Sequence, residues 1–129
     1  MNTIRHGIIL NVENFESCVK FYRSVFDLPL MFEKNEGSFK LCCLEYGDCY
    51  LMIETEGVAS SKEKSIAECP TKFCFNVPNI DDALVHLKKL NIEATIITND
   101  WGSTINIFDP DGNRIGIRDE ASFCKQIDP

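Results

Sequence analysis

The chain has 129 residues, of which 44% are hydrophobic and 26% charged, the balance of an ordinary globular protein. This composition excludes a disordered, collagen-like or coiled-coil chain, and the length suits one compact domain or two tightly fused halves. Twenty acidic residues against thirteen basic ones give a net charge of −7, which disfavours nucleic acid as a partner because a phosphate binder carries a basic face. No apolar run is long enough for a membrane span, and residues 1–6 lack a signal-peptide core, so we expect a cytoplasmic protein.

Two segments of the sequence recur at the same distance along the chain. Residues 11–16 (NVENFE) resemble residues 76–81 (NVPNID), and Tyr46-Gly47-Asp48 resembles Asp111-Gly112-Asn113. Both pairs are separated by 65 positions, from residue 11 to 76 and from 46 to 111. Two matches in one register predict that the chain contains two copies of a single structural unit.

The first unit is expected over residues 3–55. Its apolar, weakly alternating start predicts a strand over 3–12. Asn14 is expected to cap a helix that Pro29 ends, with an apolar face at helical spacing. That face consists of Phe15, Cys18, Val19, Tyr22 and Phe26. Further strands are predicted over 30–35, 38–46 and 49–55, separated by turns at Gly37 and Gly47.

The second unit is expected over residues 71–119 and repeats this order. A strand over 71–77 precedes a helix capped by Asn79, whose apolar face is formed by Ile80, Ala83, Leu84, Leu87 and Leu90. Strands are then predicted over 94–98, 103–109 and 113–119. The polar, turn-rich residues 56–70 are interpreted as a linker, and residues 120–129 as a tail.

Each unit therefore reads as βαβββ, which predicts an α+β fold with two βαβββ modules in one domain spanning residues 1–129. A four-stranded sheet with a helix on one face leaves its other face open. Two such curved mixed sheets can enclose a cleft for a small molecule.

Two motifs carry a family resemblance. Residues 21–28 (FYRSVFDL) and 108–115 (FDPDGNRI) resemble the vicinal oxygen chelate superfamily, which includes glyoxalase I, extradiol dioxygenases, and fosfomycin- and bleomycin-resistance proteins. The resemblance covers nearly the whole chain and implies a glyoxalase/bleomycin-resistance-like fold and a homodimer. Metal enzymes and metal-free binders share these motifs, so they do not identify an activity.

The resemblance also implies where metal ligands would stand. In this sequence those positions are Gly7, Lys72, Gly116 and either Leu51 or Met52, and none of these side chains suits a divalent cation. A register shift would offer His6 and Glu54 as alternative metal ligands. The seven cysteines contain no CxxC pair and are interpreted as reduced thiols.

Strand parity predicts which side chains face the cleft. Residues in phase with the family's ligand positions point into the cleft, and their neighbours point toward the helices. We expect ligand contacts from Arg5, Ile9, Asn11, Met52, Glu54, Lys72, Cys74, Trp101 and Arg118. The basic members suit a small anionic ligand, with Arg5 or Arg118 pairing a carboxylate, and Trp101 could stack on an aromatic one.

Three functions are consistent with these observations. The first is a metal-free small-molecule-binding protein of the bleomycin-resistance type, without a cofactor. The second is a metal-dependent lyase or isomerase resembling glyoxalase I, or a related dioxygenase, with one divalent metal ion. The third is a structural module that uses the fold to dimerise. No nucleophile elbow, phosphate loop or dinucleotide fingerprint is present, and the catalytic residues stay unassigned.

Overall fold

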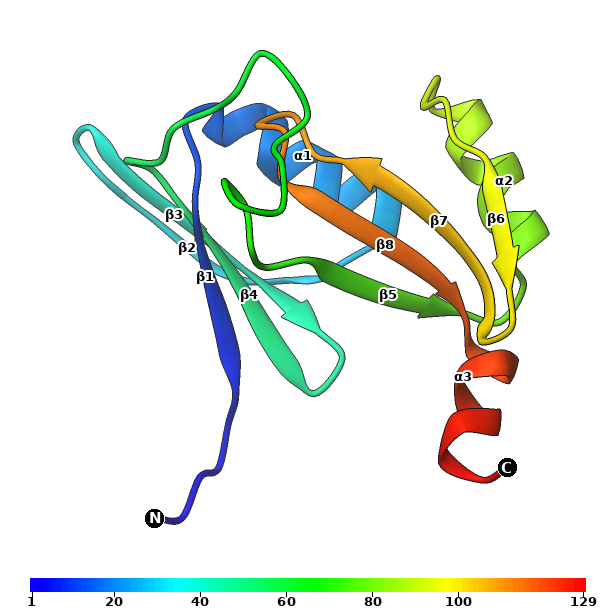
Figure 1. The fold of residues 1–129 in the computed structure, drawn as a ribbon. Coiled ribbons are helices and arrows are strands. Elements are labelled where there is room, and N and C mark those ends of the chain that lie inside the picture. Colours follow the sequence, from blue (N-terminus) through cyan, green and yellow to red (C-terminus); the bar gives the residue numbers. More distant parts are fainter. The chain divides into compact units, whose positions relative to one another are not determined.

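The computed structural model describes residues 1–129, which form two compact units, Met1–Ser61 and Lys62–Pro129 (Figure 1). Each unit contains a four-stranded mixed sheet and a helix in the order βαβββ. The predicted α+β fold with two βαβββ modules is therefore confirmed.

In the first unit, the first strand in the sequence pairs with the last one. Its elements are β1 (Gly7–Asn11), α1 (Phe15–Phe26), β2 (Leu30–Glu36), β3 (Phe39–Tyr46) and β4 (Cys49–Glu54). The strand order is β1-β4-β3-β2, with β1 parallel to β4 and the other neighbours antiparallel. The first strand, predicted over residues 3–12, covers only Gly7–Asn11.

The second unit repeats this topology. Its elements are β5 (Phe73–Val77), α2 (Ile80–Lys89), β6 (Ile96–Asn99), β7 (Gly102–Phe108), β8 (Arg114–Asp119) and α3 (Glu120–Ile127). The strand order is β5-β8-β7-β6, with β5 parallel to β8. The equivalent turn residues Gly47 and Gly112 both have positive φ, 59° and 85°, which explains why glycine recurs there.

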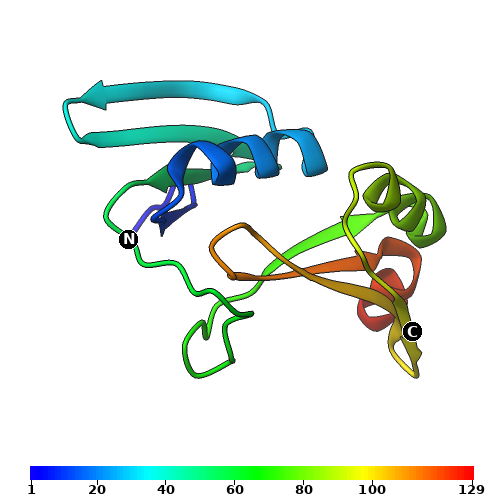
Figure 2. The same cartoon turned by 90° about the horizontal axis from the view of Figure 1, so that it is seen from above.

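The helix of each unit covers one face of that unit's own sheet (Figure 2). In α1 the buried stripe is Cys18, Tyr22 and Val25, at i, i+4 and i+7. Phe15 and Val19, which were expected in this face, are only half-buried. The stripe is rotated toward Val25, and Tyr22 is fully buried with its ring edge-on to Phe21 at 5.2 Å.

The two helix starts differ although both carry asparagine. The Asn79 side chain accepts a hydrogen bond from the Asp82 backbone N at 3.0 Å, as predicted for a cap. Asn14 has φ −92° and ψ 74°, and its side chain makes no capping hydrogen bond. The predicted side-chain cap on α1 is therefore wrong. The carbonyls of both asparagines accept the first helical hydrogen bond, from the Cys18 N at 3.0 Å and from the Ala83 N at 3.2 Å.

Residues 120–129, interpreted from sequence as a tail, contain the helix α3. The Asp119 side chain caps it by accepting from the Ser122 N at 3.1 Å. Glu120 follows in the first turn, where its charge favours the helix dipole. Strand β8 ends at this capping residue. The start of α3 therefore has a local signal, Asp119 followed by Ser122, that the sequence contains.

Residues 56–70 contain no helix or strand. Their first part is hydrogen-bonded to the first unit and their second part to the second unit. The Gly57 N donates to the Val12 carbonyl at 3.1 Å, and Lys64 Nζ donates to Asn113 Oδ1 at 2.8 Å. Asn113 belongs to a buried turn in which Asp109 Oδ1 accepts from the Asn113 N at 2.9 Å. None of the three helices has the length and apolar character that a bilayer crossing requires.

Candidate functional site

The face of the first sheet opposite α1 carries the side chains expected from parity. Ile9 is 57% exposed and pairs with Met52, while Asn11 pairs with Glu54 on the neighbouring strand. Leu51 is fully buried on the helix side. The ambiguity between Leu51 and Met52 is therefore resolved in favour of Met52, and we call this surface the open face of the first unit.

One row of side chains crosses all four strands of this open face. Ile9 pairs with Met52, Met52 with Cys43, and Cys43 with Phe32. All four side chains are apolar, and Phe32 is exposed although it is large. Sequence reasoning found two members of this row but missed Cys43 and Phe32, because they lie on strands whose facing was not assigned.

The Cys43 thiol of this row is influenced by a positive charge and lies near a second sulfur atom. Burial raises the pKa of the Cys43 thiol, and the positive charge of Arg5 opposes that rise. Cys43 Sγ lies 3.9 Å from Met31 Sδ. The positive charge of Arg5 therefore acts on this part of the open face, which also carries the polar pair Asn11 and Glu54.

Gly7 is covered by an aromatic ring. A Cβ built on Gly7 would lie 2.0 Å from Tyr50 Cζ, so the Tyr50 ring fills the space where a side chain at Gly7 would stand. The two residues are cross-strand partners. His6 is exposed, and its carbonyl accepts from the Tyr50 N at 3.1 Å. Sequence reasoning missed Tyr50, because nothing in the spacing shows that its ring lies over the glycine.

The open face of the second unit is polar. Lys72 Nζ donates to Asn106 Oδ1 at 2.6 Å, and a Cβ on Gly116 would lie 3.0 Å from Lys72 Cε. Cys74 pairs with Gly116 and is exposed. Lys72 thus lies across the face over Gly116, as Tyr50 lies over Gly7 in the first unit.

Arg118 is held by α3 and by the turn before β7. Its Nη2 donates to the Trp101 carbonyl at 2.7 Å, and its guanidinium carbon lies 5.0 Å from the Phe123 ring centroid. Its Nε is buried without a hydrogen-bond partner. Trp101 is exposed at this turn. The structure therefore brings Arg118 and Trp101 together, and adds Phe123, which lies in the segment interpreted as a tail.

The side chains at the family's metal positions do not fit a metal ion. Gly7 and Gly116 offer no ligand atom, and a Tyr50 ring and a Lys72 chain occupy the adjacent space. Lys72 is a cation, and the thioether of Met52 is a poor ligand for hard cations. Neither unit gathers three or more His, Cys, Asp or Glu side chains that could hold an ion. His6 and Glu54, the alternative ligands, lack such a third partner.

Comparison with known proteins gives a consistent family. A family model described as a glyoxalase-like domain matches residues 6–122. A glyoxalase family protein from Enterococcus faecalis has a similar structure, with a TM-score of 0.73, 21% identity and coverage of 91% of this chain and 97% of that chain. Lactoylglutathione lyase from Agrobacterium tumefaciens has a TM-score of 0.68 and 19% identity, with coverage of 92% of this chain and 94% of that chain.

A third similar structure is the fosfomycin resistance protein FosX from Listeria monocytogenes, complexed with Mn(II) and sulfate. It gives a TM-score of 0.70 and 14% identity, with 92% of this chain and 93% of that chain covered. At these identities the similarity shows the fold alone. None of the curated proteins matches this chain.

Proposed function

Because the chain belongs to the glyoxalase-like domain family, we propose that it uses that family's fold as a metal-free small-molecule-binding protein, similar to the bleomycin-resistance type. The observation that carries this proposal is the filling of the metal positions by noncoordinating groups. The Tyr50 ring occupies the space beside Gly7, and the Lys72 chain lies over Gly116. A metal-dependent lyase would need ligand atoms at these points.

The open faces supply what a binding protein needs. In the first unit, the row Ile9–Met52–Cys43–Phe32 is apolar, with Ile9 and Phe32 exposed, Met52 half-buried and Cys43 buried. The positive charge of Arg5 acts on the Cys43 thiol of this row. Such a combination suits a small ligand that joins an aromatic body to an anionic group. We therefore propose an aromatic carboxylate as the ligand class.

The second unit supports an anionic ligand independently. Lys72 is a cation on its open face, and the buried Arg118 Nε has no acceptor. A buried donor without an acceptor is costly and rare in native structures, so an anion that accepts from it would be favourable. The polar, basic character of this face is the second reason for proposing an anion over a neutral molecule.

The test is a thermal-shift screen of small carboxylates, read against matched variants. Naphthalene-1-carboxylate is the reference probe, because it combines a planar apolar body with one negative charge. Ile9→Gln removes apolar surface from the row, and Val85→Gln is its control, since Val85 is 52% exposed on α2 and Ile9 is 57% exposed.

We expect naphthalene-1-carboxylate to raise the melting temperature of the wild-type protein and of Val85→Gln, and to have a smaller effect on Ile9→Gln. Equal shifts in both variants would overturn the assignment of the open face. A screen in which no carboxylate stabilises the protein would overturn the binding function and favour a structural, dimerising module. Stabilisation only in the presence of added divalent ions would favour the metal-dependent lyase.

A further inference from the structure

The helix side of the first unit contains a groove that is separate from the open face. It lies between α1 and the β2–β3 hairpin and has a volume of about 830 Å³. Cys42 lines it, whereas the next residue, Cys43, belongs to the row on the opposite face of the sheet. Pockets of this size are typical for small organic ligands.

The charge of this groove differs in sign from that of the whole chain. The chain carries −7, but four basic side chains and two acidic ones line the groove. These are Lys20, Arg23, Lys34, Lys40, Glu16 and Glu33. Glu16 is already paired, because its Oε1 lies 2.7 Å from Lys40 Nζ. The groove therefore has an excess of positive charge that an anion would complement.

The groove also has an apolar part. Phe15 and Val19 on α1, with Leu41 on β3, are half-buried in its lining. Cys42 is almost fully buried, and its burial raises the pKa of its thiol. The charge of Glu33, its cross-strand partner, adds to this rise, and the charge of Arg23 opposes it. Arg23 lines the same groove as Cys42. The rotation of α1 that buries Val25 leaves Phe15 and Val19 here.

We propose that this groove is a second binding site, for a small amphipathic organic anion such as an aliphatic carboxylate. The carboxylate binds the Arg23 guanidinium, whose paired N–H groups match its two oxygens, with Lys20 one helical turn away. The alkyl chain lies against Phe15, Val19 and Leu41. The site is distinct from the open face and does not depend on the proposed function.

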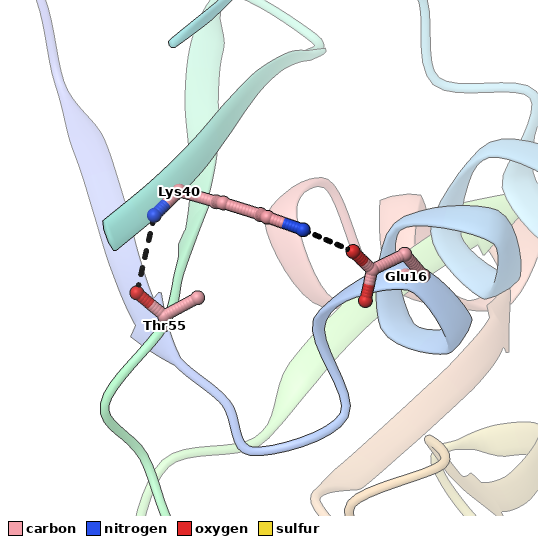
Figure 3. A network of polar contacts seen from close by, with 3 residues as sticks. All are labelled: Glu16, Lys40 and Thr55. Atoms are coloured by element: carbon pink, nitrogen blue, oxygen red, sulfur yellow. Dashed lines mark hydrogen bonds and ion pairs between the residues drawn. The ribbon is translucent and has the colours of Figure 1, made fainter. Parts of the chain in front are cut away.

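Lys40 is placed to respond to such a ligand. Its backbone N donates to Thr55 Oγ1 at 3.2 Å, and its carbonyl accepts from the Thr55 N at 3.1 Å, so its main chain is fixed. Its side chain then extends from β3 to Glu16 on the first turn of α1 (Figure 3). An exposed ion pair contributes little to stability, so Lys40 can leave Glu16 and add its positive charge to the groove when an anion binds.

The experiment is an amide NMR titration of the full chain with octanoate, and with 1-octanol as an uncharged probe of the same chain length. We expect octanoate to shift the signals of α1, β2 and β3 residues around the groove, and 1-octanol to shift them far less. Signals of Ile9 and Met52 on the open face should change less than those of Val19 and Cys42.

Variants test the charges. Arg23→Gln should weaken octanoate binding by about tenfold, because it removes a charge-assisted hydrogen-bond donor. Glu16→Gln should strengthen binding by about threefold, because it removes the competing acceptor for Lys40. Lys125→Gln on the exposed side of α3 is the matched control for loss of one positive charge, and should leave the affinity unchanged. All three sites are exposed, so the variants should fold.

The groove proposal is overturned if octanoate shifts no signals at 10 mM, on the order of the weakest ligand affinities of interest. It is also overturned if the shifts centre on the open face, or if Lys125→Gln weakens binding as much as Arg23→Gln. None of these results contradicts the open-face proposal, which has its own test with naphthalene-1-carboxylate and the Ile9→Gln variant.

Discussion

At the scale of single residues, two glycines show how the open faces are built. Gly7 has the Tyr50 ring over it, and Gly116 has the aliphatic chain of Lys72. Tyr50 comes from the adjacent strand β4 and Lys72 from the position just before β5. Each long side chain lies where a metal-ligating side chain would otherwise project. At these two points the open face is thus formed by a neighbouring side chain. That side chain can lie against the sheet only because the residue beneath it is glycine.

Gly7→Ala should destabilise the protein by about 1 kcal/mol, because the new Cβ would displace the Tyr50 ring from its contact. In a Tyr50→Ala background the same substitution should cost much less, since the ring is no longer there. Urea unfolding of the four proteins in this cycle gives the coupling. Additive effects of the two substitutions would contradict the packing of Tyr50 over Gly7.

Gly57→Ala is the matched substitution at a different kind of contact. A Cβ on Gly57 would lie 2.2 Å from the Asn11 carbonyl oxygen, which is backbone and cannot swing aside. We expect a loss of about 2 kcal/mol from this variant, with no relief from Tyr50→Ala. Urea unfolding in both backgrounds checks this, and relief by Tyr50→Ala would show that the variants act through some other effect.

The Glu16–Lys40 pair predicts a titration. The hydrogen bond from Lys40 lowers the pKa of Glu16, with its own backbone and the lysine charge adding to the effect. A lowered pKa in the folded state stabilises the protein above the pKa of the unfolded chain, and this contribution is lost as pH falls through the folded value. Lys40→Met should therefore raise the Glu16 pKa toward its ordinary value.

Carboxyl NMR of Glu16 and Glu68 from pH 2 to 7 measures this change, over about the range in which carboxylates titrate. Glu68 is the internal control, because hydrogen bonds from Ser65, not from Lys40, lower its pKa. An unchanged Glu16 pKa in Lys40→Met would contradict the pairing seen across the groove.

At the scale of elements, the repeated helix starts give a matched pair of variants. Asn79→Ala should destabilise the second unit by about 1 kcal/mol, because it removes the side-chain acceptor for the Asp82 N. Asn14→Ala should cost less, because the Asn14 side chain makes no capping hydrogen bond. Urea unfolding of the two variants compares them directly, and equal losses would contradict the difference between the caps.

Much of the fold follows from the sequence because the repeat and strand parity are local patterns. Glycine-containing turns 65 positions apart, at Gly47 and Gly112, correctly predicted two equal modules. Alternation in β1 and β5 correctly separated exposed from core side chains: Ile9 is exposed and Phe73 buried. Both patterns depend on neighbours along the chain, so a single sequence contains them.

The parts that could not be predicted depend on contacts across the structure. The Tyr50 ring over Gly7 and the Lys72 chain over Gly116 join residues far apart in sequence. The groove exists because α1 buries Val25 in place of Val19, a rotation that its apolar spacing permits in either direction. The helix α3 is an exception, since Asp119 and Ser122 form a recognisable cap that sequence reasoning overlooked.

At the scale of the whole molecule, exposed apolar side chains predict self-association. The family resemblance implies a homodimer, and large exposed residues such as Phe32 and Ile9 are typical of surfaces that another molecule covers. We expect light scattering after size exclusion to give twice the chain mass of 14.7 kDa. A mass of one chain at a concentration of about 100 μM, where even weak dimers form, would contradict this expectation.

The most direct test of the central claim is the metal content of the purified, untagged protein. The protein is incubated separately with Zn, Ni, Mn, Fe(II) and Co, desalted, and measured by elemental analysis. Because Gly7, Lys72, Gly116 and Met52 supply no suitable ligand set, we predict that no ion is retained stoichiometrically. Retention of about one ion per chain, as at a true metal site, would contradict the metal-free function and direct attention to His6 and Glu54 as ligands.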